Sequence, residues 1–389
     1  MDKKIKICAL TTISKTMDWF IVDSMRNLAE NGYDITLVCN MDKDFISKNS
    51  DYAKCVPLQM SRGTSVSDLI KSILWLTKFF KKEKFDMIYY TTPNASFYSS
   101  IAGVLSGTKT RVYNQCGLRY VSFSGIKRLI FKTIEKATCL LSTHIRAKSF
   151  KNMDFAIEEK LCPKNKVSVV GIGGTIGVSL SDCRSFNHKQ AKSELRAKYE
   201  IPENAFVYGY VGRINADKGL NELITAFSEI SKKIPNAYLV MVGMVDDTNP
   251  ITDKNMDIAK SSKNIIMTGN VPKETVYKHM AMFDVLVHPT YREGFGMVLQ
   301  EAMGVEIPII TTDVPGPSEV IENNISGILC QAQDPKDLQN KMELLFENPE
   351  LRENFVKAGK ERAEKYFDRP IMLKNILTDM NEIINGNRK

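Results

Sequence analysis

Short apolar runs alternate with amphipathic stretches along the first half of the chain. The strand-like runs there are Ile5–Leu10, Asp34–Cys39, Met87–Thr91 and Arg111–Gln115. The helix-like stretches between and after them are Asp18–Glu30, Val66–Phe80, Asn94–Leu105 and Lys127–Leu141. This alternation is typical of βαβ units, and it predicts a parallel sheet with helices on both faces.

The same alternation restarts beyond a polar interval, Ser181–Glu200. The second set of strand-like runs is Ala205–Val211, Ala237–Val242, Asn264–Thr268, Val285–His288 and Ile307–Thr311. The helix-like stretches are Leu220–Ile234, Glu274–Met282 and segments that continue to the end of the chain. We therefore expect an α/β protein of two doubly wound, Rossmann-like domains, residues 1–185 and 190–366, with a ligand cleft between the carboxyl ends of their strands.

Composition supports this picture without narrowing the function. A length of 389 residues suits two domains, and 43% hydrophobic with 25% charged residues is ordinary for a soluble globular protein. No uninterrupted apolar stretch reaches about 18 residues, so we expect no transmembrane helix. The start, KKIKICALTT, lacks the apolar length of a signal peptide. The eight cysteines show no CxxC or zinc spacing, which favours buried free thiols in a reducing cytosol.

Positive charge is concentrated in the first half of the chain. Residues 1–190 carry 29 Lys and Arg against 16 Asp and Glu, whereas residues 191–389 carry 24 against 29. The net charge of +8 thus combines +13 with −5. This asymmetry indicates that the first half faces an anionic surface or substrate. Nucleic acid, anionic lipid and a diphosphate-bearing acceptor are all compatible with it.

Two stretches of the first half, Leu69–Phe80 and Ile126–Leu141, are amphipathic and carry lysines. We expect their apolar faces to pack on the first sheet. The alternative is that a basic edge lies on a membrane surface, and both can hold for one helix.

The segment Glu293–Glu301, EGFGMVLQE, places two carboxylates eight residues apart around a glycine turn. Gly294 and Gly296 let backbone approach a ligand closely, because they carry no Cβ. The apolar run from Met297 is typical of a buried helix that ends at Gly304. A glycine turn that leads into a helix N-terminus suits an anion. The two acids then suit the hydroxyl groups of a sugar.

A second loop, GRINADKG at 212–219, carries two cations between a strand and a helix. Gly212 closes the strand, and Arg213 and Lys218 lie on either side of the loop. A planar guanidinium and a compact ammonium suit a diphosphate, although taken alone both could be solvated loop charges. The presence of EGFG in the same half of the chain favours the phosphate interpretation.

Metal-binding patterns are weak. The triplet Asp42-Lys43-Asp44 follows a strand, and we expect it to be a solvated loop. None of the four histidines has ligand spacing to another, so we predict no metal site. His288 ends a strand near the proposed site, where packing or hydrogen bonding is its expected role.

The motifs together resemble those of the group 1 (family 4) retaining glycosyltransferases of GT-B fold. The matching segments are GRINADKG at 212–219, HPTYREGFGMVLQEAMGVEIPIITTDVPGPSEVI at 288–321 and NNISGIL at 323–329. The resemblance is strong over residues 205–330. In the first half, NQCGLRY at 114–120 and VVGIGGTIGVSLSDC at 169–183 are similar to bacterial enzymes that extend lipid-diphosphate-linked sugars for surface polysaccharides.

The resemblance implies a role for each matching residue. Arg213 and Lys218, beside Gly212, would bind the donor diphosphate and stabilise the leaving nucleotide. Glu293 would hold donor-sugar hydroxyls at the reacting carbon, and Glu301 would bind the ribose hydroxyls. The backbone amides that would meet the sugar or phosphate are those of Gly294, Phe295, Gly296 and Met297. Retention would follow from attack on the face that the nucleotide leaves, with the departing phosphate accepting the acceptor's proton.

The resemblance also implies substrates and location. A hexose or N-acetylhexosamine-type sugar would pass from a nucleotide-diphosphate sugar, most simply a UDP-sugar, to a polyprenyl-diphosphate-linked saccharide of a capsule or O-antigen. Neither a metal nor another cofactor is implied, nor a nucleic-acid partner. The enzyme would be cytoplasmic, in peripheral contact with the anionic inner face of the cell membrane. The final helix, Arg369–Ile384 within residues 367–389, would cross back to the first domain.

The chain departs from the family pattern in two places, and both affect what the resemblance implies about the donor. Many relatives have a Gly-Gly loop after the first strand, where this chain reads TTISKTMDWF. Many also have His-Gly where this chain has Cys116-Gly117, and that histidine often contacts the donor sugar. The donor is therefore not assigned from relatives. A sugar-nucleotide epimerase or phosphorylase of the same fold, and a non-catalytic protein that binds anionic polymers, are the alternatives.

Overall fold

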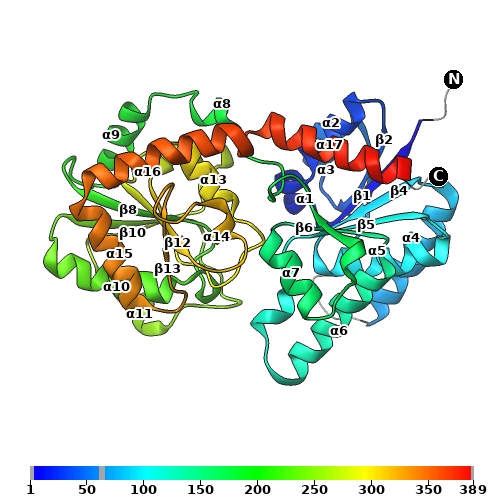
Figure 1. Ribbon diagram of the computed structural model, residues 1–389, viewed down its shortest axis with the longest axis horizontal. Coiled ribbons are helices and arrows are strands. Elements are labelled where there is room, and N and C mark those ends of the chain that lie inside the picture. The colour runs from blue at the N-terminus through cyan, green and yellow to red at the C-terminus, as the bar shows by residue number, and fades with distance from the viewer. Residues whose placement is uncertain (1–3, 61–65, 387–389) are drawn as a thin grey trace. The chain divides into compact units, whose positions relative to one another are not determined.

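The chain forms two compact α/β units, and each has one parallel sheet between layers of helices (Figure 1). The computed structural model describes residues 4–60 and 66–386. The first unit is Met1–Ile176 together with Pro370–Lys389, and the second is Gly177–Arg369. The predicted α/β class, with two doubly wound sheets, is confirmed.

The sheet of the first unit has the strand order β3-β2-β1-β4-β5-β6-β7 over the described residues. Its strands are β1 (Lys6–Ile13), β2 (Asp34–Asn40), β3 (Ala53–Pro57), β4 (Met87–Tyr90), β5 (Thr110–Gln115), β6 (His144–Ala147) and β7 (Val167–Val169). The four strand-like runs predicted for the first half of the chain correspond to β1, β2, β4 and β5. Side chains alternate across the sheet, so Ile7 and Ala9 enter one core and Cys8 and Leu10 enter the other.

Helices cover both faces of this sheet. They are α1 (Ser14–Phe20), α2 (Val22–Glu30), α3 (Lys43–Asn49), α4 (Val66–Glu83), α5 (Pro93–Ser106), α6 (Gly125–Leu141), α7 (Phe150–Glu158) and α17 (Arg369–Gly386). Met17 and Met25, from α1 and α2, share one core with Met380 of α17. Phe80 and Tyr98, from α4 and α5, belong to the other core. The last helix thus completes the first unit.

Two local predictions for the first unit were wrong. The stretch Asp18–Glu30 is not one helix, because α1 and α2 meet at Ile21, whose φ of −127° lies outside the helical range. The Ile21 side chain is buried at this break. The triplet at 42–44 is exposed to solvent, as predicted, but it begins a helix and is not a loop. Asp42 is the N-cap of α3, and its carboxylate accepts a hydrogen bond of 2.8 Å from the Phe45 amide.

The two amphipathic lysine-bearing helices meet the sheet only in part. Leu76 and Phe80 of α4 are buried, as predicted for an inward apolar face. On α6, Cys139 is buried, but Ile126, Leu129 and Ile130 are exposed to solvent. The expectation that the apolar face of α6 packs on the sheet is therefore wrong for most of that face.

The second unit has a parallel sheet of order β10-β9-β8-β11-β12-β13 over the described residues. Its strands are β8 (Phe206–Val211), β9 (Ala237–Val242), β10 (Ile265–Gly269), β11 (Val285–His288), β12 (Ile309–Thr312) and β13 (Ile328–Cys330). Its helices are α8 (Leu180–Cys183), α9 (His188–Lys198), α10 (Leu220–Lys233), α11 (Asp253–Ser261), α12 (Val276–Met280), α13 (Met297–Gly304), α14 (Pro317–Val320), α15 (Pro335–Glu347) and α16 (Pro349–Arg362). The interval at 181–200, predicted to be polar, contains α9. This helix was missed because its two alanines and one leucine are too few to give a clear helical period.

The strand order of the second unit reverses between β8 and β11. In doubly wound sheets the loops at such a switch point leave a crevice outside the carboxyl ends of the strands. The loop after β8 leads through a single 3-10 turn, Ala216–Lys218, into α10. The loop after β11 leads into α13. Both predicted motifs of this unit therefore emerge at one switch point.

Two further expectations concern the whole chain. Within the described residues, no helix combines the length and the apolar character needed to cross a bilayer. All eight cysteines are free thiols, and six of them are buried. Cys55 is half-buried and Cys116 is exposed.

Candidate functional site

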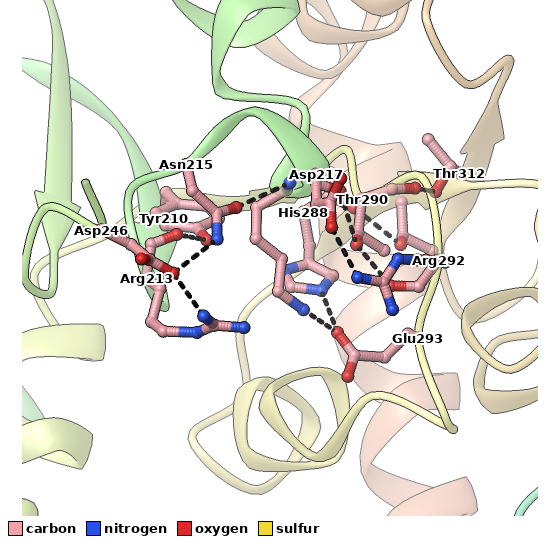
Figure 2. A network of polar contacts seen from close by, with 12 residues as sticks. Tyr210, Arg213, Asn215, Asp217, Asp246, His288, Thr290, Arg292, Glu293 and Thr312 are labelled. Atoms are coloured by element: carbon pink, nitrogen blue, oxygen red, sulfur yellow. Dashed lines mark hydrogen bonds and ion pairs between the residues drawn. The ribbon is translucent and has the colours of Figure 1, made fainter. Parts of the chain in front are cut away.

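The candidate site lies in the second unit, where the loops after β8, β9 and β11 meet (Figure 2). Glycines allow these loops to touch. A Cβ on Gly243 would lie 1.9 Å from the Gly212 carbonyl oxygen, and one on Gly219 would lie 1.9 Å from the Pro289 carbonyl oxygen. Both glycines have positive φ, +146° and +71°. Larger residues would therefore force the loops apart.

The first cation of the GRINADKG loop, Arg213, contacts an acid that follows β9. Its guanidinium pairs with the Asp246 carboxylate, which also accepts a bond of 3.1 Å from the Asn215 side-chain amide. Hydrogen bonds from Thr248, then from Asn215, lower the pKa of Asp246 to about 2, against the opposing effect of burial. The Arg213 side chain is still 62% exposed, so its guanidinium is accessible to a ligand.

The second cation, Lys218, lies directly against Glu293. Its ammonium contacts the Glu293 carboxylate, and that carboxylate lies 3.6 Å from Nε2 of His288. Asn215 supports the turn, because its side-chain oxygen accepts a bond of 3.1 Å from the Lys218 amide. The structure thus brings together two residues that are 75 positions apart in the chain.

The charge state of this cluster follows from burial and from its neighbours. Burial raises the pKa of the Glu293 carboxyl, but the Lys218 charge and the His288 contact outweigh it and hold the pKa well below its usual value. Burial lowers the pKa of His288, against the opposite effect of Glu293. The site therefore holds a carboxylate between an ammonium and a neutral imidazole. The His288 ring stacks on Tyr210 at 6.0 Å with an interplanar angle of 10°.

A second set of contacts holds the loop after β11 against the loop after β8. Arg292 pairs with Asp217 at 2.6 Å, and the Tyr291 amide donates to the Asp217 carbonyl at 2.9 Å. The Thr290 hydroxyl donates to the Arg292 carbonyl at 2.9 Å. These contacts set the position of Glu293, which follows Arg292 directly.

The glycine turn after Glu293 leads into α13, as predicted. Gly296 has a φ of +102° and is the N-cap of the helix, which begins at Met297. Phe295 is buried against Phe367, at 5.8 Å in an edge-on arrangement. On the other side, a Cβ on Gly316 would lie 2.9 Å from the carbonyl oxygens of Glu293 and Gly294. The turn is therefore held closely from two sides.

Glu301 lies on α13, about one turn after the first residue of the helix, Met297. Burial raises its pKa from 4.5 to about 7, and the charges of Arg369 and Lys273 only partly oppose that effect. The preceding residue, Gln300, is fully buried, and both of its side-chain polar atoms lack a hydrogen-bond partner within the protein. The two acids of EGFGMVLQE thus have opposite pKa shifts and different neighbours.

The predicted residues fall into three places. Lys218 and Glu293 are in direct contact, Arg213 lies with Asp246, and Glu301 lies with Arg369 and Lys273. Sequence reasoning missed the partners Asp246 and Asn215. It expected packing or hydrogen bonding for His288, which stacks on Tyr210 beside Glu293. Asp246 follows the strand next to β8, so strand adjacency was the signal that could have revealed it. Over residues 4–60 and 66–386, no group of three or more His, Cys, Asp or Glu could hold a metal ion.

Comparison with known proteins adds two family matches. Residues 191–362 match the glycosyl transferases group 1 family, and residues 6–149 match the glycosyl transferase 4-like family. Among individual sequences, the chain is 30% identical over 372 residues to the capsular polysaccharide biosynthesis glycosyltransferase CapM of Staphylococcus aureus, covering 95% of each. It is 24% identical to the UDP-Gal:alpha-D-GlcNAc-diphosphoundecaprenol alpha-1,3-galactosyltransferase of Escherichia coli, over 79% of this chain and 78% of that protein.

Solved structures show the same fold. HepE from Anabaena, in complex with UDP-glucose, superposes with a TM-score of 0.79 at 17% identity, over 97% of this chain and all of that one. A glycosyltransferase from Rickettsia africae also superposes with a TM-score of 0.79 at 17% identity, over 98% of this chain and 99% of that one. At this level of identity the likeness is one of fold.

Proposed function

We propose a reaction for this chain, which belongs to the group 1 glycosyltransferases. It moves a sugar from a nucleotide-diphosphate sugar to a lipid-linked saccharide, with retention of the anomeric configuration. The observation that carries this proposal is the contact between Lys218 and Glu293 at the switch point of the second sheet. It joins a phosphate-binding cation to a carboxylate suited to sugar hydroxyls. Arg213 lies on the neighbouring loop of the same edge.

The diphosphate of the donor would lie between the two cations. Arg213 offers an exposed planar fork, and Lys218 offers a point charge held by the Asn215-capped turn. The amides of Gly294, Phe295, Gly296 and Met297 would contact the sugar or its phosphate. The N-terminus of α13 adds a favourable dipole there.

The two acids would hold two different sugars of one donor. Glu293 is ionised and close to Lys218, so it would accept hydrogen bonds from hydroxyls of the transferred sugar next to the phosphates. Glu301 would accept those of the ribose, which lies beyond the phosphates. Gly212 would let the backbone after β8 approach the nucleotide, because glycine carries no Cβ.

The chemistry would depend on positioning and on stabilising the leaving diphosphate. As the bond between the anomeric carbon and the phosphate breaks, negative charge grows on the phosphate oxygen. Lys218 and Arg213 stabilise that charge, and removal of one such contact typically slows a reaction by about a hundred- to a thousandfold. The acceptor hydroxyl attacks from the face that the phosphate leaves and gives its proton to a phosphate oxygen. Glu293 orients the sugar throughout.

The substrates follow from the relatives and the charge distribution. CapM is named for capsular polysaccharide, and the Escherichia coli relative is named for UDP-galactose and a diphosphoundecaprenol-linked sugar. We propose a UDP-hexose or UDP-N-acetylhexosamine as donor and a polyprenyl-diphosphate-linked saccharide of a capsule or O-antigen as acceptor. The net charge of +13 on residues 1–190 suits a diphosphate acceptor at the anionic inner face of the cell membrane. Neither a metal nor another cofactor is needed for these steps.

The test is a transfer assay with the donor chosen by binding. A thermal-shift screen of nucleotide-sugars ranks the donors, because ligand binding stabilises the folded state. The best donor is then incubated with polyprenyl-diphosphate-linked saccharides, and the product linkage is read by NMR. We expect an extended saccharide with the anomeric configuration of the donor. An inverted linkage would contradict retention, and release of an isomeric nucleotide-sugar without acceptor would identify an epimerase.

A further inference from the structure

Helix α6 of the first unit turns an apolar stripe toward solvent. Ile126 is 79% exposed, Leu129 65%, Ile130 52% and Leu140 50%. At about 100° per residue these positions lie within roughly 100° of one another around the helix, so they form one stripe. We define the solvent-facing stripe as these four side chains. Soluble proteins rarely place several large apolar residues together on one exposed helix face.

The orientation of α6 is fixed from its inner side. The acid of this helix, Glu135, is buried, and its carboxylate accepts hydrogen bonds from the Tyr113 hydroxyl at 3.0 Å and the Gln115 amide at 2.8 Å. Both partners belong to β5. Cys139 and Thr138 are buried on the same side. The helix thus holds its only carboxylate inward and its apolar stripe outward, which reverses the usual pattern of a surface helix.

Cations flank the solvent-facing stripe. Lys127 and Lys136 are exposed, and neither takes part in an ion pair among the described residues. Arg128 and Lys132 lie near Glu159, at 3.8 and 2.5 Å. Just before the helix, Phe123 lies 4.3 Å from the Lys127 ammonium. Apolar side chains bordered by lysines and an aromatic ring are typical of helices that lie in a membrane interface.

The neighbouring helices also expose large apolar side chains to solvent. In Figure 1, α4, α5 and α6 lie together on one side of the first unit, and α5 packs between the other two. Ile70 and Leu74 of α4 and Leu105 of α5 are each more than half exposed. The exposed apolar residues therefore concentrate on this helical layer, within the half of the chain that carries the net positive charge.

We propose that the solvent-facing stripe of α6 docks on an anionic bilayer surface, with Leu129 and Ile130 entering the interface and Lys127 and Lys136 pairing with lipid phosphates. The occupant is a bilayer because the apolar stripe and its unpaired cations occur together, and an interface of acidic lipids satisfies both. The proposal assigns a surface that is separate from the donor site. It rests on the membrane location included in the proposed function and assigns that contact to named residues. The vesicle test needs neither donor nor acceptor, so its failure is distinguishable from a failure of the transfer reaction.

The test is flotation of the full chain with vesicles, without donor or acceptor. Vesicles of phosphatidylcholine mixed with phosphatidylglycerol are compared with vesicles of phosphatidylcholine alone. We expect binding to the anionic vesicles that weakens as salt is raised. The double variant Leu129→Glu/Ile130→Glu should reduce binding at least about tenfold. The double variant Lys127→Glu/Lys136→Glu should reduce it about twenty-five-fold or more, since each removed lysine contributes roughly fivefold.

The control is Ile325→Glu, which changes a 56% exposed isoleucine in the second unit. It should leave vesicle binding unchanged, and circular dichroism should show native folding for every variant. Failure of the unchanged chain to bind anionic vesicles would overturn the proposal. So would an equal loss in Ile325→Glu. Dimerisation that Leu129→Glu/Ile130→Glu abolishes, with vesicle binding retained, would assign the stripe to a second copy of the chain and also overturn it.

Discussion

At the scale of single residues, the site contains two carboxyl groups whose surroundings shift their pKa values in opposite directions. Lys218 and His288 hold the pKa of Glu293 well below its ordinary value, after burial has raised it. At Glu301 the charges of Arg369 and Lys273 only partly oppose the effect of burial, which raises the pKa to about 7. Glu293 is therefore a permanent anion beside Lys218, whereas the pKa of Glu301 lies near neutral pH. This difference supports separate roles for the two acids on one donor.

Replacement of Lys218 by Gln should slow transfer about a hundredfold in kcat/KM, because the leaving diphosphate loses a charge-assisted contact. Steady-state kinetics with the best donor measures it. The matched control is Lys232→Gln, which changes an exposed lysine of α10 paired with Glu229. Near-normal turnover in Lys218→Gln would exclude Lys218 from the phosphate site.

Donor affinity should depend on pH through Glu301. Because its pKa of about 7 lies above the ordinary 4.5, the carboxyl gains a proton as pH falls through neutrality and can no longer accept two ribose hydroxyl hydrogens. The Kd should therefore rise up to about tenfold for each pH unit below 7. Titration calorimetry with a nucleotide-sugar measures this Kd. The diphosphate of such a donor gains no proton in this pH range, so it does not contribute to the pH dependence. Glu301→Gln should bind weakly at every pH, and an unchanged pH slope in that variant would contradict the assignment.

At the scale of elements, the site exists because three loops at one sheet edge are close enough to touch. Gly219 links the 3-10 turn to α10 and lies against the Pro289 carbonyl of the loop after β11. Gly243 and Gly212 make the equivalent approach between the loops after β9 and β8. A side chain at Gly219 would push the loop that carries Lys218 away from the loop that carries Glu293. The glycines of this motif thus position the charged residues.

Gly219→Ala should destabilise the second unit by at least about 3 kcal/mol, since it combines a left-handed backbone with a clash against Pro289. The control is Gly269→Ala, because Gly269 has almost the same φ, +70°, and no atom lies within 4 Å of the position that its Cβ would take. That variant should cost only about 1–2 kcal/mol. Urea unfolding compares the two. Equal losses would show that the approach of the two loops does not matter to stability.

At the scale of the whole molecule, the chain returns to its first unit after it completes the second. Helix α17 places Met380, Ile383 and Ile384 in a core of the first unit. Arg146 of β6 donates to the Asp379 carboxylate of α17 at 2.8 Å, and both side chains are largely buried. The first unit is therefore completed only by the last residues of the chain.

Asp379→Ala should lower the free energy of unfolding of the first unit by about 3 kcal/mol, because it leaves the Arg146 guanidinium buried without its partner. Calorimetry should show this as a lower transition temperature. The control is Asp51→Ala, which removes the partner of Arg26 in an exposed pair of the same unit. A surface pair contributes little, so a comparable loss in the control would contradict the role of α17.

The sequence was sufficient to predict the fold class, but not the contacts among the candidate site residues. Long apolar strands and the EGFG and GRINADKG motifs are local signals. Short strands such as β6, with the sequence HIRA, carry no clear period. The contact between Lys218 and Glu293 depends on strand order, which no local pattern contains. The outward face of α6 was mispredicted because periodicity reveals a stripe without showing whether sheet or solvent covers it.

The most direct test of the account is the turnover of Glu293→Gln with the preferred donor and acceptor. This change keeps the shape of the side chain and removes its charge, so kcat/KM should fall about a thousandfold while the protein stays folded. The control, Glu306→Gln, changes a glutamate of the same unit that pairs with Lys360 and should keep normal turnover. Full turnover in Glu293→Gln would contradict the central claim that this carboxylate holds the transferred sugar.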